Sequence, residues 1–234
     1  TYQNAVDLIK EYGATLKEIS IKEASLLHMK DIGLPENDRS VTYENIQARE
    51  RTQILMDVAN MENGLVIGTG DLSELALGWC TYNGDHMSMY AVNTSIPKTL
   101  VRYLVAWVKD TTTGKKKEVL QDILNTPISP ELLPPDEAGN ILQKTESSIG
   151  PYVLHDFFLY HFLRYGASPK KIYTLAKYTF KDSFSDEEIK KWLRVFIKRF
   201  FAQQFKRNCI PDGVKVGSIS LSPRGDLRMP SDAN

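Results

Sequence analysis

The sequence predicts an α/β fold in which a parallel sheet is followed by a helical C-terminal extension. In the first part of the chain, short apolar strands alternate with amphipathic helices, the pattern of βαβ units. From residue 152 onward, helices follow one another with no strand between them. In addition, the apolar strand Leu65–Ile67 ends in Gly68-Thr69-Gly70 and leads directly into a helix, which is typical of α/β domains that bind anions or nucleotides.

The composition indicates a globular chain of one domain. Of its 234 residues, 42% are hydrophobic and 25% are charged. Lysine plus arginine balance aspartate plus glutamate at 29 each, which argues against a strongly basic nucleic-acid binder. Cys80 and Cys209 have no metal-ligand spacing, and two cysteines in a chain of this size suggest a reducing compartment. Because the sequence also has no apolar run of about 20 residues and no signal peptide, we expect a cytoplasmic location and no membrane contact.

The N-terminal segment reads as a helix followed by a strand. Val6, Ile9 and Tyr12 recur at helical spacing, which predicts a helix over Tyr2–Tyr12. Alternating apolar residues then predict a strand over Leu16–Ile21. A chain that begins with a helix lacks the strand expected to open an α/β unit, so we expect an upstream piece of the domain to be missing.

The next segment contains three predicted helices and one strand. Apolar periodicity predicts a helix over Asn45–Met61, and the buried strand Leu65–Ile67 then leads into a helix over Leu72–Gly78. After a loop, a helix is predicted over Lys98–Lys109, with Pro97 near its first turn. The polar, lysine-rich residues Thr111–Lys117 are expected to form a mobile tip.

The C-terminal part is expected to be helical. Recurrent proline and glycine predict a loop-rich connection before helices over Tyr152–Tyr165, Pro169–Tyr178 and Asp186–Asn208. The last of these helices is basic and amphipathic, so we expect it to pack on the core or on a partner subunit. The predicted division is 1–126 for the α/β core, 127–151 for the connection and 152–234 for the helical extension and tail.

The glycine turn and the helix after it each allow two interpretations. Gly68-Thr69-Gly70 is not a dinucleotide fingerprint, because Ser73 stands where the third glycine belongs, so alone it fits a nucleotide contact or a plain turn. Asp71 and Glu74 have the spacing of a capping box. The same Glu74 carboxylate, in the first turn beside a nucleotide, is also placed to bind Mg²⁺ or a ribose hydroxyl.

Other polar and aromatic residues are similarly ambiguous. Asn45 and Arg49 are four residues apart and share a helix face, which is either solvated or turned to a ligand. Trp79–Tyr82 offers two aromatic rings, suited to a flat ligand ring or to packing under a loop. His155 and His161 are six apart, the wrong spacing for a shared metal site on a helix, so we interpret both as structural.

Several longer strings extend over nearly the whole chain in a fixed order. They are Tyr43-Glu44-Asn45-Ile46-Gln47-Ala48-Arg49, Gly68-Thr69-Gly70-Asp71-Leu72-Ser73-Glu74-Leu75-Ala76-Leu77-Gly78-Trp79, Asn83-Gly84-Asp85-His86-Met87-Ser88, Ile96-Pro97-Lys98-Thr99-Leu100 and Ser222-Pro223-Arg224-Gly225-Asp226. Together they resemble the synthetase domain of glutamine-dependent NAD synthetases, which are ATP-using amidating ligases. The resemblance implies a Rossmann-like sheet of the ATP-pyrophosphatase (adenine nucleotide alpha-hydrolase-like) type. It also implies an N-terminally incomplete domain over 1–234, because the family's Ser-Gly-Gly-x-Asp-Ser phosphate loop is absent.

The resemblance implies ATP-dependent amidation of deamido-NAD (nicotinic acid adenine dinucleotide) to NAD. The substrate carboxylate forms an acyl-adenylate, ammonia attacks it, and AMP and pyrophosphate are released. Mg²⁺ accompanies ATP, an upstream amidase domain supplies ammonia from glutamine, and a homodimer or higher homo-oligomer is expected. Two alternatives stay open: a non-catalytic dimerising fragment without its phosphate loop, or a different ATP-pyrophosphatase amidoligase, against which the string Trp79–Ser88 argues.

The resemblance also assigns roles to individual residues. Glu74 and Lys98 are expected to be catalytic, with Glu74 as the candidate magnesium ligand. ATP is expected at Thr69, Lys98 and Ser129, although the register of Ser129 in Pro127-Ile128-Ser129-Pro130 is open. The residues expected at deamido-NAD are Asn45, Arg49, Glu74, Trp79, Cys80, Thr81, Tyr82, Asp85 and Lys206.

Overall fold

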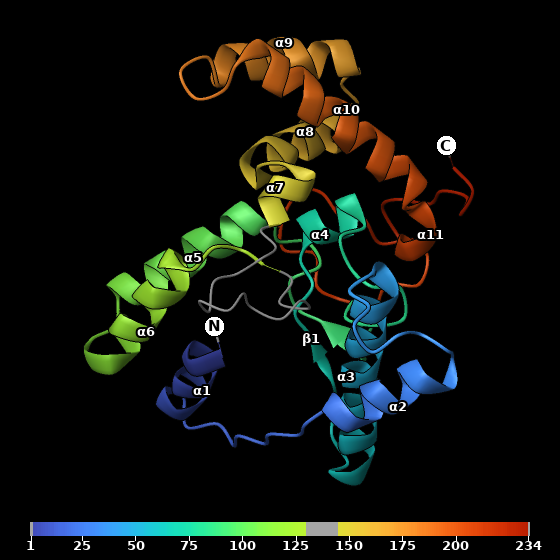
Figure 1. Ribbon diagram of the computed structural model, residues 1–234. Coiled ribbons are helices and arrows are strands. Elements are labelled where there is room, and N and C mark those ends of the chain that lie inside the picture. The colour runs from blue at the N-terminus through green and yellow to red at the C-terminus, as the bar shows by residue number, and fades with distance from the viewer. Residues whose placement is uncertain (1, 130–144, 234) are drawn as a thin grey trace.

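The computed structural model describes residues 2–129 and 145–233, and helices dominate it (Figure 1). A small parallel sheet lies at its centre. The elements are α1 (Tyr2–Glu11), α2 (Lys22–Asp31), α3 (Val41–Met61), β1 (Ile67–Gly68), α4 (Leu72–Leu77), β2 (Tyr90–Ala91), α5 (Lys98–Asp110), α6 (Gly114–Asn125), α7 (Thr145–Ile149), α8 (Tyr152–Tyr165), α9 (Pro169–Thr179), α10 (Asp186–Ala202) and α11 (Gln204–Arg207).

The sheet confirms the α/β prediction. Ile67 pairs with Tyr90 and Gly68 with Ala91, so β1 and β2 run parallel, and α4 lies between them in the chain. Gly68 is required here, because a Cβ on it would lie 2.3 Å from the hydroxyl of Ser88. Within the described residues, the sheet has two strands.

The short helix α4 is the buried centre of the structure. Asp71 is its N-cap and forms the predicted capping box with Glu74. Gly78 ends the helix at φ 59°, the left-handed region that glycine tolerates best. A Cβ on Gly78 would also lie 2.3 Å from Cβ of Gln203, so the close approach of α4 to the α10–α11 junction depends on this glycine.

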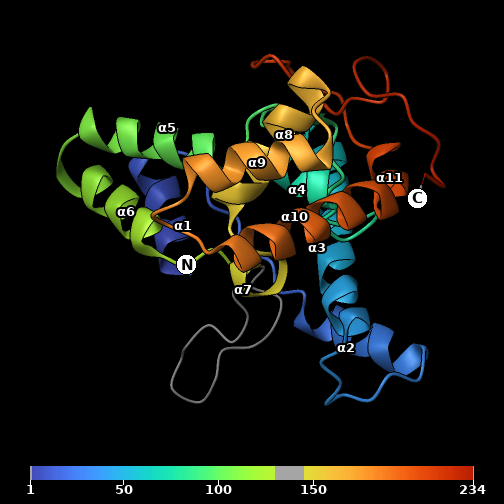
Figure 2. The same ribbon diagram turned by 90° about the horizontal axis from the view of Figure 1, so that it is seen from above.

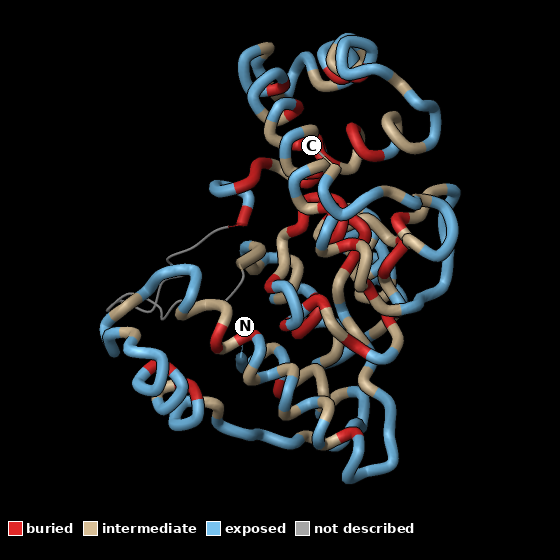
Figure 3. The backbone as a smooth tube through the Cα atoms, turned by 90° about the vertical axis from the view of Figure 1, so that its right-hand side faces the viewer, coloured by how far each residue is buried: buried red, intermediate tan, exposed pale blue. Residues whose placement is uncertain are grey.

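The hydrophobic core joins α4 to the helical extension. Helix α4 packs against both α8 and α10. Helix α9 contacts these two helices as well and lies beside them in the view from above (Figure 2). The buried stretches run through the middle of the molecule, whereas the outer helices are mostly exposed (Figure 3). The core residues are Leu72, Leu75, Ala76, Leu77, Ile149, Tyr152, Leu154, Phe158, Leu159, Ile172, Ala176, Ile189, Leu193, Phe196, Phe200, Ile210 and Leu221.

The C-terminal helices largely confirm their prediction. Helix α8 has the predicted bounds, between the N-cap Pro151 and the left-handed Gly166. The single helix expected over Asp186–Asn208 is wrong in one respect, because α10 ends at Ala202 and α11 begins at Gln204. This break lets Arg207, which is fully buried, donate to the carbonyl oxygen of Ala76 at 3.0 Å.

Two expectations, for the segment after α1 and for the segment after α5, are wrong. Leu16–Ile21 is mostly exposed chain without regular secondary structure, and helix α2, which was not predicted, follows it. The predicted mobile tip Thr111–Lys117 shrinks to a short turn, because Gly114 at φ 64° begins α6. Helix α6 then packs back on α5 and against α1, on the left side of Figure 1.

The strand predicted over Leu65–Ile67 is displaced and is not buried. It is observed as Ile67–Gly68, and Leu65 and Ile67 are 58% and 49% exposed. In the described part of the chain, β1 has a strand partner on one side, which leaves these side chains uncovered. The predicted connection over 127–151 contains α7 at its end, and its residues 130–144 lie outside the described residues.

Candidate active site

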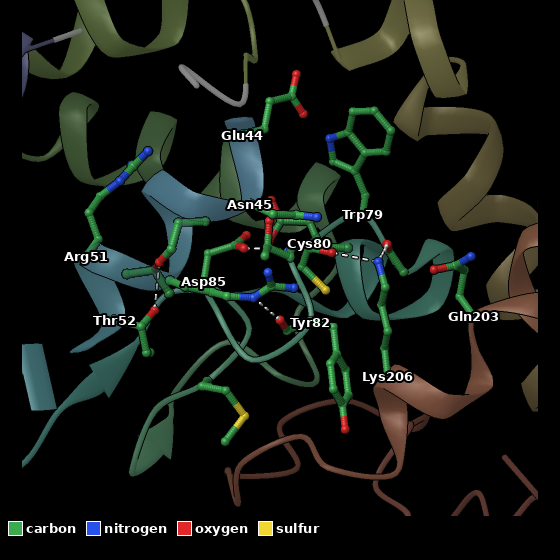
Figure 4. Close-up of a pocket in the computed structure, with 18 of the residues that line it drawn as sticks. Glu44, Asn45, Arg51, Thr52, Trp79, Cys80, Tyr82, Asp85, Gln203 and Lys206 are labelled. Carbon is green, nitrogen blue, oxygen red and sulfur yellow. Dashed lines mark hydrogen bonds between the residues drawn. The ribbon is translucent and has the colours of Figure 1, made fainter. Parts of the chain in front are cut away.

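A cavity of about 760 Å³ lies between α3, the end of β1, the loop after α4 and the α10–α11 junction (Figure 4). All the predicted site residues line it except Lys98, which contacts the lining residue Glu74 from behind. The predicted residues in the lining are Asn45, Arg49, Thr69, Glu74, Trp79, Cys80, Thr81, Tyr82, Asp85, Ser129 and Lys206. The structure therefore brings together residues from five separate segments of the chain.

Helix α3 supplies one wall of the cavity. Its N-cap Ser40 accepts a hydrogen bond from the Thr42 amide, which fixes where the helix begins. Asn45 and Arg49 then lie one turn apart on the cavity side. Arg49 Nε donates to the Tyr82 carbonyl oxygen at 3.2 Å, so it ties α3 to the loop after α4.

The loop after α4 forms the floor and is held from two directions. Asp85 Oδ1 accepts from the Thr81 amide at 2.6 Å, which closes the loop on itself. Lys206 Nζ donates to the carbonyl oxygens of Gly78 at 2.9 Å and Cys80 at 2.7 Å, contacts drawn in Figure 4. Burial lowers the pKa of Lys206, although the cation remains hydrogen-bonded.

Sequence reasoning missed three cavity residues on the helical extension, which are Arg199, Gln203 and Phe205. Arg199 Nε donates to the Leu77 carbonyl oxygen at 2.8 Å, and its guanidinium lies 5.3 Å from the centre of the Trp79 ring. Gln203 lines the cavity beside Gly78. The basic pattern of α10 was visible in the sequence, but nothing in it indicated which face would meet a cavity.

A partly buried ion cluster lies at the cavity wall, to which Glu74 belongs. Lys98 Nζ is 2.6 Å from Oδ2 of Asp71 and 2.7 Å from Oε1 of Glu74. Glu74 Oε2 also accepts from the Asp71 amide at 3.1 Å, and Asp71 Oδ1 accepts from the Glu74 amide at 3.0 Å. Glu74 therefore caps α4 and carries a charge toward the cavity at the same time.

Burial and charge compete within this cluster. Burial, together with the neighbouring Glu74 carboxylate, raises the pKa of Asp71 above its ordinary range, while Lys98 opposes the shift. Burial lowers the pKa of Lys98, but the charges of Glu74 and Asp71 outweigh it and leave the pKa raised. Lys98 is therefore held as an ammonium ion close to the cavity.

Glu74 is the predicted magnesium ligand, and Glu44 and Asp85 also carry carboxylates in the cavity lining. The described residues contain no group of three histidine, cysteine, aspartate or glutamate side chains that could hold a metal ion. Glu74 has a carboxylate with lone pairs beyond its two contacts, and its side chain is 25% exposed. This fits a Mg²⁺ ion held mainly by phosphate oxygens and water, and does not fit a resident ion caged by protein.

The remaining predicted residues are also placed. Thr69 follows β1 directly, at the carboxyl end of the parallel strands. Ser129, which follows α6 in the chain, lines the same cavity. His155 is buried, and its Nε2 lies 2.7 Å from the Ile149 carbonyl oxygen, in keeping with a structural role. In the described ranges, no helix is long and apolar enough to cross a membrane.

Comparisons with known proteins agree on one family. The NAD synthase family model matches residues 1–178. Glutamine-dependent NAD(+) synthetase from Mycobacterium leprae is 44% identical over 257 aligned positions, covering 99% of this chain. The Acinetobacter baylyi protein of the same name is 30% identical and covers 77% of the chain. This chain spans 38% of the first relative and 30% of the second.

Two solved structures have a similar fold. A glutamine-dependent NAD(+) synthetase from Cytophaga hutchinsonii superposes with a TM-score of 0.71 at 22% identity, over 98% of this chain and 36% of that one. An NMN synthetase from Francisella tularensis superposes with a TM-score of 0.59 at 23% identity, over 85% of this chain and 69% of that one. The fold likeness and the family model agree with the resemblance seen in the sequence strings. The chain belongs to the NAD synthase family.

Proposed function

We propose that this chain carries out the ATP-dependent amidation of deamido-NAD to NAD. The observation that supports this most strongly is the cavity itself. It collects nearly every residue for which the family resemblance implies a substrate or ATP contact, from α3 to α11. A cavity of about 760 Å³ is within the size range of cofactor sites in proteins.

The cavity wall suits the nicotinate end of the substrate. Trp79 and Tyr82 offer flat apolar surfaces from the loop after α4, and Asn45 offers an amide from α3. Arg49 and Lys206 add positive charge on opposite sides of that loop. We assign deamido-NAD to this region, with Cys80, Thr81 and Asp85 shaping the loop that holds it.

The ion cluster suits the activation step. The substrate carboxylate attacks the α-phosphate of ATP, which forms an acyl-adenylate and releases pyrophosphate. Negative charge builds on the phosphate in this step. Lys98, which Asp71 and Glu74 hold as an ammonium ion, is the residue that we assign to stabilise this charge. Thr69 and Ser129 provide hydroxyl donors to the ATP phosphates.

Ammonia attacks the activated carbonyl in the second step, and AMP leaves. Mg²⁺ bound with ATP neutralises phosphate charge, and Glu74 is the residue placed to supply one ligand. The protein contributes further by orienting the two nucleotides, which depends on a rigid binding site more than on acid–base groups. We propose that ammonia comes from glutamine through an amidase domain of the intact protein.

A direct assay distinguishes the proposed function from two alternatives. The intact protein would be incubated with ATP, Mg²⁺ and an ammonium salt, and offered deamido-NAD, nicotinic acid mononucleotide or a purine nucleotide. We expect NAD formation from deamido-NAD, with at most slow reaction of the other two acceptors. Preference for a purine nucleotide would indicate a different amidoligase, and no turnover with any acceptor would indicate a non-catalytic module.

A further inference from the structure

The carboxylate of Asp156, on α8, joins the N-terminal ends of α4 and α5. Its Oδ1 accepts from the Ser73 hydroxyl, and its Oδ2 accepts from the Thr99 amide at 3.0 Å and the Thr99 hydroxyl at 2.7 Å. Burial raises the pKa of Asp156, while the hydrogen bonds from Ser73 and Thr99 oppose the shift. Both oxygens of a largely buried carboxylate are therefore engaged, on two different helices.

These contacts replace a missing helix cap. The N-cap of α5 is Pro97, which has no side chain able to accept a hydrogen bond from the helix. Instead, the Lys98 amide donates to the Ser73 hydroxyl oxygen at 2.8 Å, and the Thr99 amide donates to Asp156. A carboxylate at this end of a helix also favours the helix dipole.

The same contacts flank the ion pair of the cavity. Ser73 immediately precedes Glu74, and Lys98 immediately precedes Thr99, so each partner of the ion pair is next to a residue that Asp156 holds. Tyr152, one turn before Asp156 on α8, lies under Lys98, with its ring centre 5.6 Å from Nζ. Asp156 and Tyr152, one turn apart on α8, therefore fix the position of the Lys98 ammonium group.

We propose that Asp156 is a positioning residue for Lys98, acting through Ser73 and the first turn of α5. This inference rests on the proposed function, in which Lys98 meets the reacting phosphate. Asp156 itself does not line the cavity. Its role is to keep the ammonium of Lys98 between Asp71 and Glu74.

The kinetic test compares two aspartate substitutions in the intact protein. Asp156→Asn is expected to lower kcat roughly 10²-fold, because small displacements at a reacting centre have effects of that size. KM for deamido-NAD should stay within about threefold, since the substrate wall is untouched. The matched control is Asp186→Asn on α10, which removes the charge of a carboxylate that accepts a hydrogen bond of 2.6 Å from Tyr173 and does not line the cavity, so kcat should stay unchanged.

A double-mutant cycle separates positioning from general support of the fold. In a Lys98→Met background, Asp156→Asn should cost less than about twofold further in kcat, because the group it positions is already gone. A repeat of the full loss in that background would overturn the proposal. So would an unchanged kcat in the single Asp156→Asn variant, measured at a temperature where both proteins are folded.

A labelling experiment tests the same inference without any substrate. Trace acetylation of the ligand-free protein, read by mass spectrometry, should label Lys98 several-fold faster in Asp156→Asn, because an ammonium group displaced from Asp71 and Glu74 is more accessible to the reagent. Asp186→Asn should leave Lys98 labelling as in the wild type. Absence of NAD synthesis in the wild type would defeat the proposed function alone, whereas unchanged Lys98 labelling would defeat the positioning role.

Discussion

Oδ2 of Asp71 lies 2.6 Å from the ammonium nitrogen of Lys98, and only 2% of the Asp71 side chain is exposed. A buried carboxylate is costly unless a cation and hydrogen bonds compensate it. Here the N-cap of α4 is neutralised by the first residue of α5, which Glu74 contacts as well. The stability of α4 and the charge presented to the cavity thus depend on the same three side chains.

Glu74→Gln separates the capping role from the chemical one. Glutamine can still accept from the Asp71 amide, so the capping box is mostly kept and stability should fall by well under ~1 kcal/mol. The change removes the charge that faces Lys98 and the phosphates, so the rate of amidation with saturating ammonia should fall by a factor of about 10²–10³. Thermal melting and steady-state rates on one preparation measure both. Full activity of Glu74→Gln would contradict the chemical role and indicate that Glu74 only caps α4.

Asn45→Ala should weaken deamido-NAD and leave ATP affinity near that of the wild type. The reason is its place on the cavity face of α3, beside the loop that carries Trp79 and Tyr82. Calorimetric titration with each ligand in turn measures the two affinities. Asn60→Ala, an exposed position on the same helix, is the matched control. Equal loss of both ligands, or loss of neither, contradicts the assignment.

How much of the site could be predicted differs between its parts. Local strings marked Asn45, Glu74 and the loop after α4, because each string is contiguous in the sequence. The ion pair joins Glu74 to Lys98 across 24 residues, and no local pattern indicates such a contact. Asp156 reaches Ser73 across 83 residues and was not singled out at all.

The fold shows the same division. Helix α8 could be bounded from its own residues, because Pro151 and Gly166 stop the helical pattern on both sides. The strand expected over Leu16–Ile21 failed, since alternation of apolar residues does not reveal whether a partner strand lies alongside. The strand β2 has two residues, which is too short for an apolar pattern to be recognised in the sequence. It is identified as a strand by its pairing with β1.

His155 makes stability depend on pH. Burial lowers its pKa from 6.5 to about 4, so the unfolded chain takes up a proton on this residue before the folded one does. Its contribution to stability is present above pH 6.5 and is lost as the pH falls toward 4. Denaturant unfolding across this range should show a shallower pH dependence for His155→Gln than for the wild type.

The control for this experiment is His161→Gln, which removes a half-buried histidine from the same helix. Asp71 and Asp156, whose pKa values are raised, act in the opposite direction, so the comparison is between variants at each pH. Identical pH profiles for the wild type and His155→Gln would contradict the structural role of the buried neutral ring.

We also expect a homodimer with α3 near its interface. Helix α3 leaves Val41, Leu55 and Met61 exposed at 67%, 54% and 80%, which is apolar surface suited to burial against a second subunit. Light scattering at micromolar concentration should give twice the mass of one chain. Met61→Glu, a change outside the cavity lining, should shift the protein toward monomer, and a monomeric wild type would contradict this expectation.

The most direct test of the proposed reaction follows oxygen from the substrate carboxylate. Deamido-NAD labelled with ¹⁸O in that carboxylate would be given to the intact protein with ATP, Mg²⁺ and ammonia, and the products analysed by mass spectrometry. An acyl-adenylate predicts one labelled oxygen in the phosphate of AMP and one in the carboxamide of NAD. Label in inorganic phosphate with formation of ADP, or unlabelled AMP, would contradict adenylation of deamido-NAD as the chemistry of this site.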